Sequence, residues 1–286
     1  MKRTLASLLS LAFGCIFSAY AQNSNSLLWE ISGKDLETPS YLFGTIHLMC
    51  PQDIKITPAM QEALSASERL VLEIDMDEPG VMQKMQSASI MQDGSTLKSL
   101  LSEKDYQFLE QYLKDSLSIP IQAVNAMNPM MLSTVLMLPV LDCQPGSYEM
   151  SLVKQAQEKE MEVYGLETIE DQVAIFNAIP LDKQSEYLMS SIREHERSVK
   201  EIKALLSAYH SENIDALYKL VHDSMKPMEG AEKVMLDDRN NKWLPQITEM
   251  SQEGATFFAV GAGHLSGPQG VIELLREKGY QLKPIQ

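Results

Sequence analysis

The sequence is poor in positive charge, in cysteine and in long apolar segments. Its 286 residues include 24 Lys and Arg against 39 Asp and Glu, a formal net charge of −15. An acidic surface repels phosphate groups, so the composition argues against nucleic acid and against an anionic membrane surface as partners. After the N-terminal segment no stretch is long and apolar enough to span a bilayer, so we expect no transmembrane span in the mature chain.

The chain also lacks low-complexity tracts and linkers rich in Gly, Ser or Pro. Hydrophobic residues make up 44% and charged residues 22% of the chain, which is typical of a globular protein. A chain of this length buries enough apolar surface to fold without a metal or a disulfide. We therefore predict a single domain over residues 22–286.

The N-terminus has the three parts of a secretory signal peptide. Two basic residues and an apolar stretch at 5–17 precede the small residues Ala19 and Ala21. This pattern predicts a signal peptide at residues 1–21, and hence a periplasmic or secreted protein. A lipoprotein anchored through Cys15 is the less favoured alternative, because the residues before it depart from the usual small-residue pattern.

Two cysteines follow the predicted signal peptide, Cys50 and Cys143. An even number of cysteines in an oxidising compartment favours a disulfide. The sequence gives no distance between them, so one disulfide and two buried thiols stay equally open. A disulfide would brace the chain next to His47, which lies three residues before Cys50.

Short apolar runs alternate with helical patterns along the chain. Strands are expected at residues 26–33, 40–47, 69–75, 161–166, 255–264 and 280–285. The segments 78–141 and 181–251 have mainly helical patterns, of which the longest covers 181–207. These elements predict an α/β (α+β) fold in which a mixed β-sheet carries a large inserted helical middle.

A four-residue motif occurs once near each end of the chain. Gly44–His47 ends one apolar run and Gly261–His264 ends another, and each is followed by a helix and then a strand. The unit strand, G-x-x-H, helix, strand therefore occurs twice, as in a weak internal duplication. Ligands in α/β sheets bind beyond the carboxyl ends of the strands, so two such turns on neighbouring strands would aim both imidazoles at one point.

Two carboxylates, Glu73 and Asp75, follow a third strand and could face the same crevice. Two histidines and one carboxylate with an open position suit a catalytic divalent metal such as zinc. A single histidine after a strand usually has only a hydrogen-bonding role, and the matched pair of motifs is what favours a site. The other histidines, at 195, 210 and 222, lie in polar helical stretches, where we expect them to be solvated.

Several short motifs together resemble the TraB/GumN family. They are the paired G-x-x-H motifs, the acidic strand 71–75, the segment 165–168 with Gln172, and the triplet 238–240. The resemblance extends from about Leu27 to Ile285. This family belongs to a superfamily with the Tiki metalloproteases, the erythromycin esterase-like hydrolases and the ChaN haem-binding lipoproteins.

The resemblance implies an α/β fold with both histidines at one site. His47, Glu73 and His264 match the family's ligand or catalytic positions, Glu167 its second acidic position, and Arg239 its arginine. The first hypothesis is an exported, metal-dependent, peptidase-like hydrolase acting on a peptide or small ester. In it, Zn, Mn or Co held by the three ligands activates water, Glu167 is general base or orienter, and Arg239 stabilises the oxyanion.

Other interpretations of these residues stay open. Glu167 and Arg239 could instead form a buried ion pair that ties the helices to the sheet. The protein could be a haem or ligand carrier with a histidine as axial ligand, or a catalytically silent interaction protein. The methionines at 127, 130, 131 and 137 favour an adaptable apolar face or groove lining over a Cu(I) site.

Overall fold

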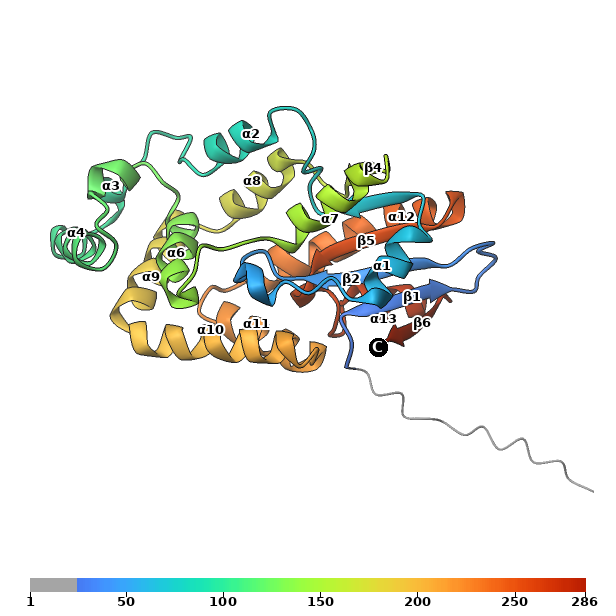
Figure 1. The fold of residues 1–286 in the computed structure, drawn as a ribbon. Coiled ribbons are helices and arrows are strands. Elements are labelled where there is room, and N and C mark those ends of the chain that lie inside the picture. The colour runs from blue at the N-terminus through green and yellow to red at the C-terminus, as the bar shows by residue number, and fades with distance from the viewer. Residues whose placement is uncertain (1–24) are drawn as a thin grey trace, which may run out of the picture.

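The computed structural model describes residues 25–286 (Figure 1). The predicted signal peptide and the alternative lipid site at Cys15 lie outside the described residues. The sheet has six strands in the order β4-β3-β5-β2-β1-β6. Their bounds are β1 Leu28–Ser32, β2 Ser40–Thr45, β3 Arg69–Leu72, β4 Glu162–Gly165, β5 Thr256–Gly261 and β6 Gln281–Ile285. Each strand lies within a segment predicted to be a strand, which confirms the mixed α/β fold.

The four strands from β4 to β2 run parallel, and β1 is antiparallel to both β2 and β6. Five of the six residues of β5 are buried. Because successive side chains of a strand point to opposite faces, both faces of the sheet must be covered at β5. Helices α1 (Pro58–Ser65), α7 (Tyr148–Glu158), α12 (Asp238–Glu253) and α13 (Val271–Glu277) supply side chains to this core.

Both predicted repeats of strand, motif, helix and strand are present. The first runs from β2 through α1 to β3, and the second from β5 through α13 to β6. Thr57 caps α1 by accepting a hydrogen bond from the backbone of Met60, and Pro58 is the first helical residue. The repeat therefore places both histidine turns at the same edge of the sheet, because β2 and β5 pair in parallel.

The helical middle lies beside the sheet (Figure 1). It has a hydrophobic core of its own, separate from the main core around the sheet. Its central residues include Leu97, Leu109, Leu132 and Leu188. Between β3 and β4 lie α2 Val81–Ala88, α3 Leu97–Leu100, α4 Glu103–Leu117, α5 Ile121–Val124 and α6 Pro129–Met137. Between β4 and α12 lie α8 Ile169–Ala178, α9 Leu181–Arg193, α10 His195–His210 and α11 Ile214–Met225. The prediction of one domain over residues 22–286 stays a prediction.

The long helical pattern at 181–207 forms two helices rather than one. Glu194 has φ −102° and ψ 35°, which separates α9 from α10. Helix α9 packs in the second core through Leu188 and Ile192, whereas Tyr209 near the end of α10 belongs to the sheet core. Hydrophobic spacing continues across a single non-helical residue, so the spacing alone did not reveal this turn.

Candidate functional site

The site lies at the carboxyl ends of four parallel strands. The two G-x-x-H turns follow β2 and β5, and Thr45 pairs with Gly261 in the register of those strands. Glu73 follows β3, and Glu167 follows β4. Parallel strands end at a common edge, so four short motifs that are far apart in sequence reach the same region.

The motif glycines allow close approach at this edge. A Cβ atom added at Gly261 would lie 3.2 Å from Glu73 Oε1 and 3.6 Å from His47 Nε2, and also 3.6 Å from His264 Cδ2. The Gly261 backbone N–H donates to Glu73 Oε1 at 2.7 Å. Three of the predicted site residues therefore converge at Gly261. Gly44 has a packing role instead, because its Cβ would lie 2.6 Å from a methyl group of Leu265.

Arg239 joins the two acidic positions of the site. Its Nη2 donates to both Glu73 and Glu167, and its Nε donates to Glu167 Oε1 at 3.1 Å. Its Nη1 donates to His264 Nε2 at 3.0 Å and to the carbonyl oxygen of Met235 at 3.1 Å. The guanidinium is also 4.6 Å from the ring centre of a tryptophan, Trp243. The predicted ion pair of Glu167 and Arg239 is therefore present, and Glu73 belongs to it.

Glu167 is the most enclosed of these acidic groups, with 1% of its side chain exposed. Besides Arg239 it accepts hydrogen bonds from Gln172 Nε2 at 2.9 Å and Trp243 Nε1 at 3.2 Å. Burial by itself raises the pKa of Glu73, but the charge of Arg239 outweighs it and holds that pKa well below its usual range. Glu73 is therefore charged at neutral pH. The Glu167 carboxylate is surrounded by hydrogen-bond donors from Arg239, Gln172 and Trp243.

His264 is buried and neutral. Its Nδ1 lies 2.6 Å from the side-chain oxygen of Asn240, which can only accept. Nδ1 therefore has the proton, and Nε2 has the lone pair that accepts from Arg239. Burial and the charge of Arg239 lower the pKa of His264 to about 3, although the charge of Glu73 opposes them.

His47 lies at the open side of the site, with 64% of its side chain exposed. Its Nδ1 is 2.8 Å from Glu149 Oε1. The hydrogen bond to Glu149 and the charges of Glu73 and Glu149 raise the pKa of His47 to about 9, although the charge of Arg239 opposes them. The site therefore has one protonated histidine at its rim and one neutral histidine inside.

Sequence reasoning missed Glu149 and Asn240, the partners of the two histidines. Asn240 lies beside Arg239 in a triplet that the sequence does single out, so the motif contained a signal for it. Glu149 lies 102 residues from His47, and no pattern in the sequence connects the two. Only the folded chain brings them together.

Other candidates lie apart from this cluster. Asp75 accepts a hydrogen bond from the backbone of Asp77 within its own turn. His195 and His210 are exposed, as expected, and His222 is partly buried against Glu232. The segment that follows β3 therefore contributes one carboxylate, Glu73, to the site.

The site contains two imidazoles and a carboxylate, which are side-chain types that divalent metals bind. Both histidines engage an acceptor through Nδ1, an arrangement that orients metal-binding imidazoles and directs Nε2 to the metal. Arg239, however, already contacts Glu73 and His264 Nε2. Within residues 25–286, no three His, Cys, Asp or Glu side chains are spaced to hold an ion as they stand.

Of the two alternatives for the cysteines, a disulfide or two buried thiols, the structure shows the disulfide. Cys50 and Cys143 form a disulfide, with their Cα atoms 5.8 Å apart. Next to it, Met49 and Gly146 exchange two backbone hydrogen bonds of 3.1 and 2.7 Å. These links fasten the segment before α7 to the first histidine turn, which is the bracing that the sequence suggests.

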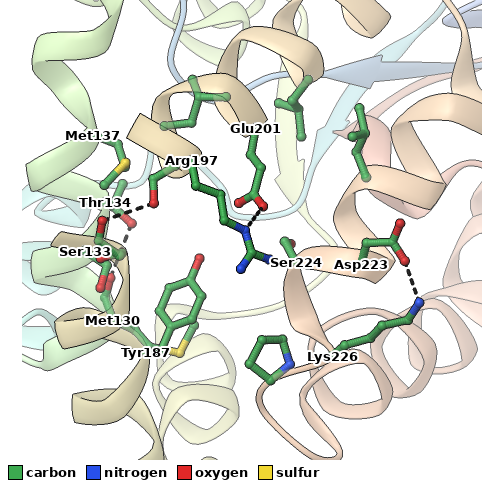
Figure 2. A pocket seen from close by; sticks show the side chains of 16 residues that line it. Met130, Ser133, Thr134, Met137, Tyr187, Arg197, Glu201, Asp223, Ser224 and Lys226 are labelled. Carbon is green, nitrogen blue, oxygen red and sulfur yellow. Dashed lines mark hydrogen bonds and ion pairs between the residues drawn. The ribbon is translucent and has the colours of Figure 1, made fainter. Parts of the chain in front are cut away.

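A separate cavity of about 690 Å³ lies among α6, α9, α10 and α11 (Figure 2). Met130 and Met137 line it, in agreement with a groove-lining role for the methionines. Its charged lining residues form ion pairs, Arg197 with Glu201 and Lys226 with Asp223 (Figure 2). The five predicted site residues are not among its lining.

The chain belongs to the TraB/PrgY/gumN family, whose model matches residues 27–284. Among curated proteins, it is similar to metalloprotease TIKI2 of Danio rerio, with 20% identity over 92% of this chain and 61% of the relative. It is also similar to metalloprotease TIKI1 of Danio rerio, with 21% identity over 94% of this chain and 65% of the relative. Metalloprotease TIKI1 of Homo sapiens is 21% identical over 94% of this chain and 64% of the relative.

The chain thus spans less than two thirds of the length of these relatives. No solved structure matches it at a significant level. Among the described residues, no helix is both long and apolar enough to cross a membrane.

Proposed function

We propose that this protein is an exported, metal-dependent hydrolase that cleaves a peptide or small ester bond. The observation that supports it is the convergence of His47, Glu73 and His264 on Gly261. The distant relatives named metalloproteases support the same class of reaction. In this proposal, His47, His264 and Glu73 would hold a zinc, manganese or cobalt ion.

Each side chain has a distinct role in this proposal. When bound, the metal supplies an acidified water and a Lewis acid. Asn240 and Glu149 hold the two imidazoles through Nδ1. Of the two roles considered for Glu167, its saturated hydrogen bonds support orientation of Arg239 over proton abstraction.

Arg239 is the candidate oxyanion donor. Two of its nitrogens bind the carboxylates, which fixes the plane of the guanidinium. Nη1 contacts neither carboxylate but donates to Met235 and to His264. If His264 binds a metal, the second of these N–H groups becomes free for a developing oxyanion. A fixed cation in a buried setting stabilises such a charge more strongly than one in water.

Metal content of residues 22–286, purified without a metal-binding tag, tests the proposal. Samples are incubated with Zn²⁺, Mn²⁺ or Co²⁺ and measured by inductively coupled plasma mass spectrometry. We expect about one ion per chain in the wild type and in the control His210→Ala, and loss of it in His47→Ala/His264→Ala. Binding should strengthen between pH 7 and 9, because the ion displaces a proton from His47.

A hydrolysis assay with quenched fluorescent peptides and a nitrophenyl ester accompanies the metal measurement. Turnover that depends on the ion and is lost in the double variant supports the proposal. Undiminished turnover in the double variant contradicts it. A Soret band after incubation with haem, lost on substitution of either histidine, would favour the carrier alternative.

Export is a separate part of the proposal, because the N-terminal segment lies outside the described residues. The intact mass of the protein secreted by an expression host tests it. A chain beginning at Gln22 supports cleavage of the predicted signal peptide. An acylated chain beginning at Cys15 would support the lipoprotein alternative.

A further inference from the structure

We propose that Glu149 is a positioning residue that fixes the ring of His47 in the site. The consequence for hydrolysis rests on the proposed function, whereas the positioning itself does not. Glu149 Oε1 lies 2.8 Å from His47 Nδ1 and also accepts from the Thr45 hydroxyl at 2.7 Å. Its second oxygen accepts from the Ser147 hydroxyl. Both carboxylate oxygens are therefore held, and only 12% of the side chain is exposed.

The segment before α7 holds Glu149 next to His47, because this segment is linked to the first histidine turn. Glu149 lies in the first turn of α7. Glu149 follows Cys143 by six positions and Gly146 by three. Cys143 is disulfide-bonded to Cys50, and Gly146 exchanges backbone hydrogen bonds with Met49, so both link the segment to the first histidine turn. The carboxylate is thus prearranged by covalent and backbone links that do not involve His47.

His47 needs such a partner because little else restrains it. Its side chain is 64% exposed, so solvent gives the ring room to rotate. A carboxylate at Nδ1 fixes both the ring orientation and the position of its proton. Nε2 is then left on the side of Gly261, where Glu73 Oε1 also lies.

The direct test is nuclear magnetic resonance of the mature chain labelled with ¹⁵N-histidine. A strong hydrogen bond slows exchange of the proton on His47 Nδ1 and gives a downfield resonance, assigned by its loss in His47→Ala. We expect Glu149→Ala to abolish this resonance. Glu149→Gln keeps an acceptor but loses the charge, so the resonance should persist and move upfield.

Glu158→Ala is the matched control, because Glu158 lies on the same helix with 64% of its side chain exposed. It should leave the His47 resonance unchanged. The Nδ1 resonance of His264, which faces Asn240, serves as an internal reference for folding. A His47 resonance that survives in folded Glu149→Ala would overturn the proposal. If Glu149→Ala does not fold, the Glu149→Gln variant decides. In that variant, a His47 resonance at the wild-type position would overturn the proposal.

Zinc titration separates this inference from the proposed function. We expect Glu149→Ala to weaken zinc affinity by about 10- to 100-fold, Glu149→Gln less, and Glu158→Ala not at all. A wild type that binds no zinc and hydrolyses nothing would overturn the proposed function while the resonance still tests the positioning. Equal zinc affinity in wild type and folded Glu149→Ala would refute the link between positioning and the metal.

Discussion

At the scale of single residues, the two motif glycines have different tasks although their motifs match. Gly44 is closed in by Leu265 and Ala262, which belong to the second turn. Gly261 faces the polar groups of the site instead, and its φ of −53° is one that any residue adopts. The first glycine therefore serves packing between the repeats, and the second keeps space among the site's side chains.

Alanine substitution separates these two tasks. We expect Gly44→Ala to lower the free energy of unfolding by about 1–3 kcal/mol, because the new methyl group overpacks a buried contact. Gly261→Ala should change stability little but weaken zinc binding, because its Cβ lies 3.2 Å from Glu73 Oε1. Urea unfolding and zinc titration of both variants check this. The reverse pattern would contradict the assignment.

His264 gives the protein a pH-dependent stability of known sign. Its pKa is about 3 in the folded protein against an ordinary value of 6.5. Below pH 6.5 the unfolded chain binds a proton that the folded chain does not, so stability falls as the pH falls from 6.5 toward 3.

We expect this loss to reach at most about 1.4 kcal/mol per pH unit from this one group. Urea unfolding at pH 7, 6 and 5 measures it. In His264→Gln the fall between pH 6.5 and 5 should be smaller, since the titrating group is gone. If the free energy of unfolding fell equally with pH in the two proteins, His264 would not be a buried, neutral histidine.

At the scale of elements, the start of α12 fixes the position of the Arg239 side chain. A π-helical turn, Lys233–Asp237, directly precedes α12. Such turns are rare and occur often at functional sites. The carbonyl oxygen of Met235, within this turn, accepts from Arg239 Nη1. The turn and the helix together thus hold the guanidinium between the ends of β3 and β4.

Removal of Arg239 should lower the stability of the folded protein strongly. Arg239→Ala leaves Glu73 and Glu167 buried without their cation, so we expect a loss of about 3–5 kcal/mol in the free energy of unfolding. Arg197→Ala is the control, because Arg197 forms exposed ion pairs and its loss should barely change the urea midpoint. Similar midpoints for the two variants would argue that the buried cluster is solvated.

At the scale of the whole molecule, the disulfide connects two parts of the chain that the sheet alone does not. It joins the turn after β2 to the segment before α7, 93 residues later. All of α2 to α6 lies inside this loop. Closing so long a loop restricts the unfolded chain more than a short one does.

Cys50→Ala/Cys143→Ala should therefore lower the free energy of unfolding by about 4 kcal/mol. Urea unfolding of the variant, and of the wild type with a reductant, measures the loss. Tryptophan fluorescence reports the sheet core, and far-ultraviolet circular dichroism reports the helical middle. Coincident transitions in the wild type support one domain, and two separate transitions would contradict it.

The sequence by itself determined the strands, the helix after the first motif and the edge of the sheet at which the site lies. These features follow from local patterns, since alternation, capping residues and strand-ending turns act over a few residues. Parallel pairing then brings motifs at strand ends to one edge, which is why His47, Glu73 and His264 could be grouped in advance, whereas Glu167 was added through the family resemblance.

Only the tertiary structure decided which of these groups touch. The insertion of Arg239 between two carboxylates, the pairing of Glu149 with His47 and the Cys50–Cys143 bridge join segments 72 to 166 residues apart. The turn between α9 and α10 likewise follows from packing in two different cores. Such contacts depend on distances set by the packing of whole elements, and local sequence patterns contain no measure of those distances.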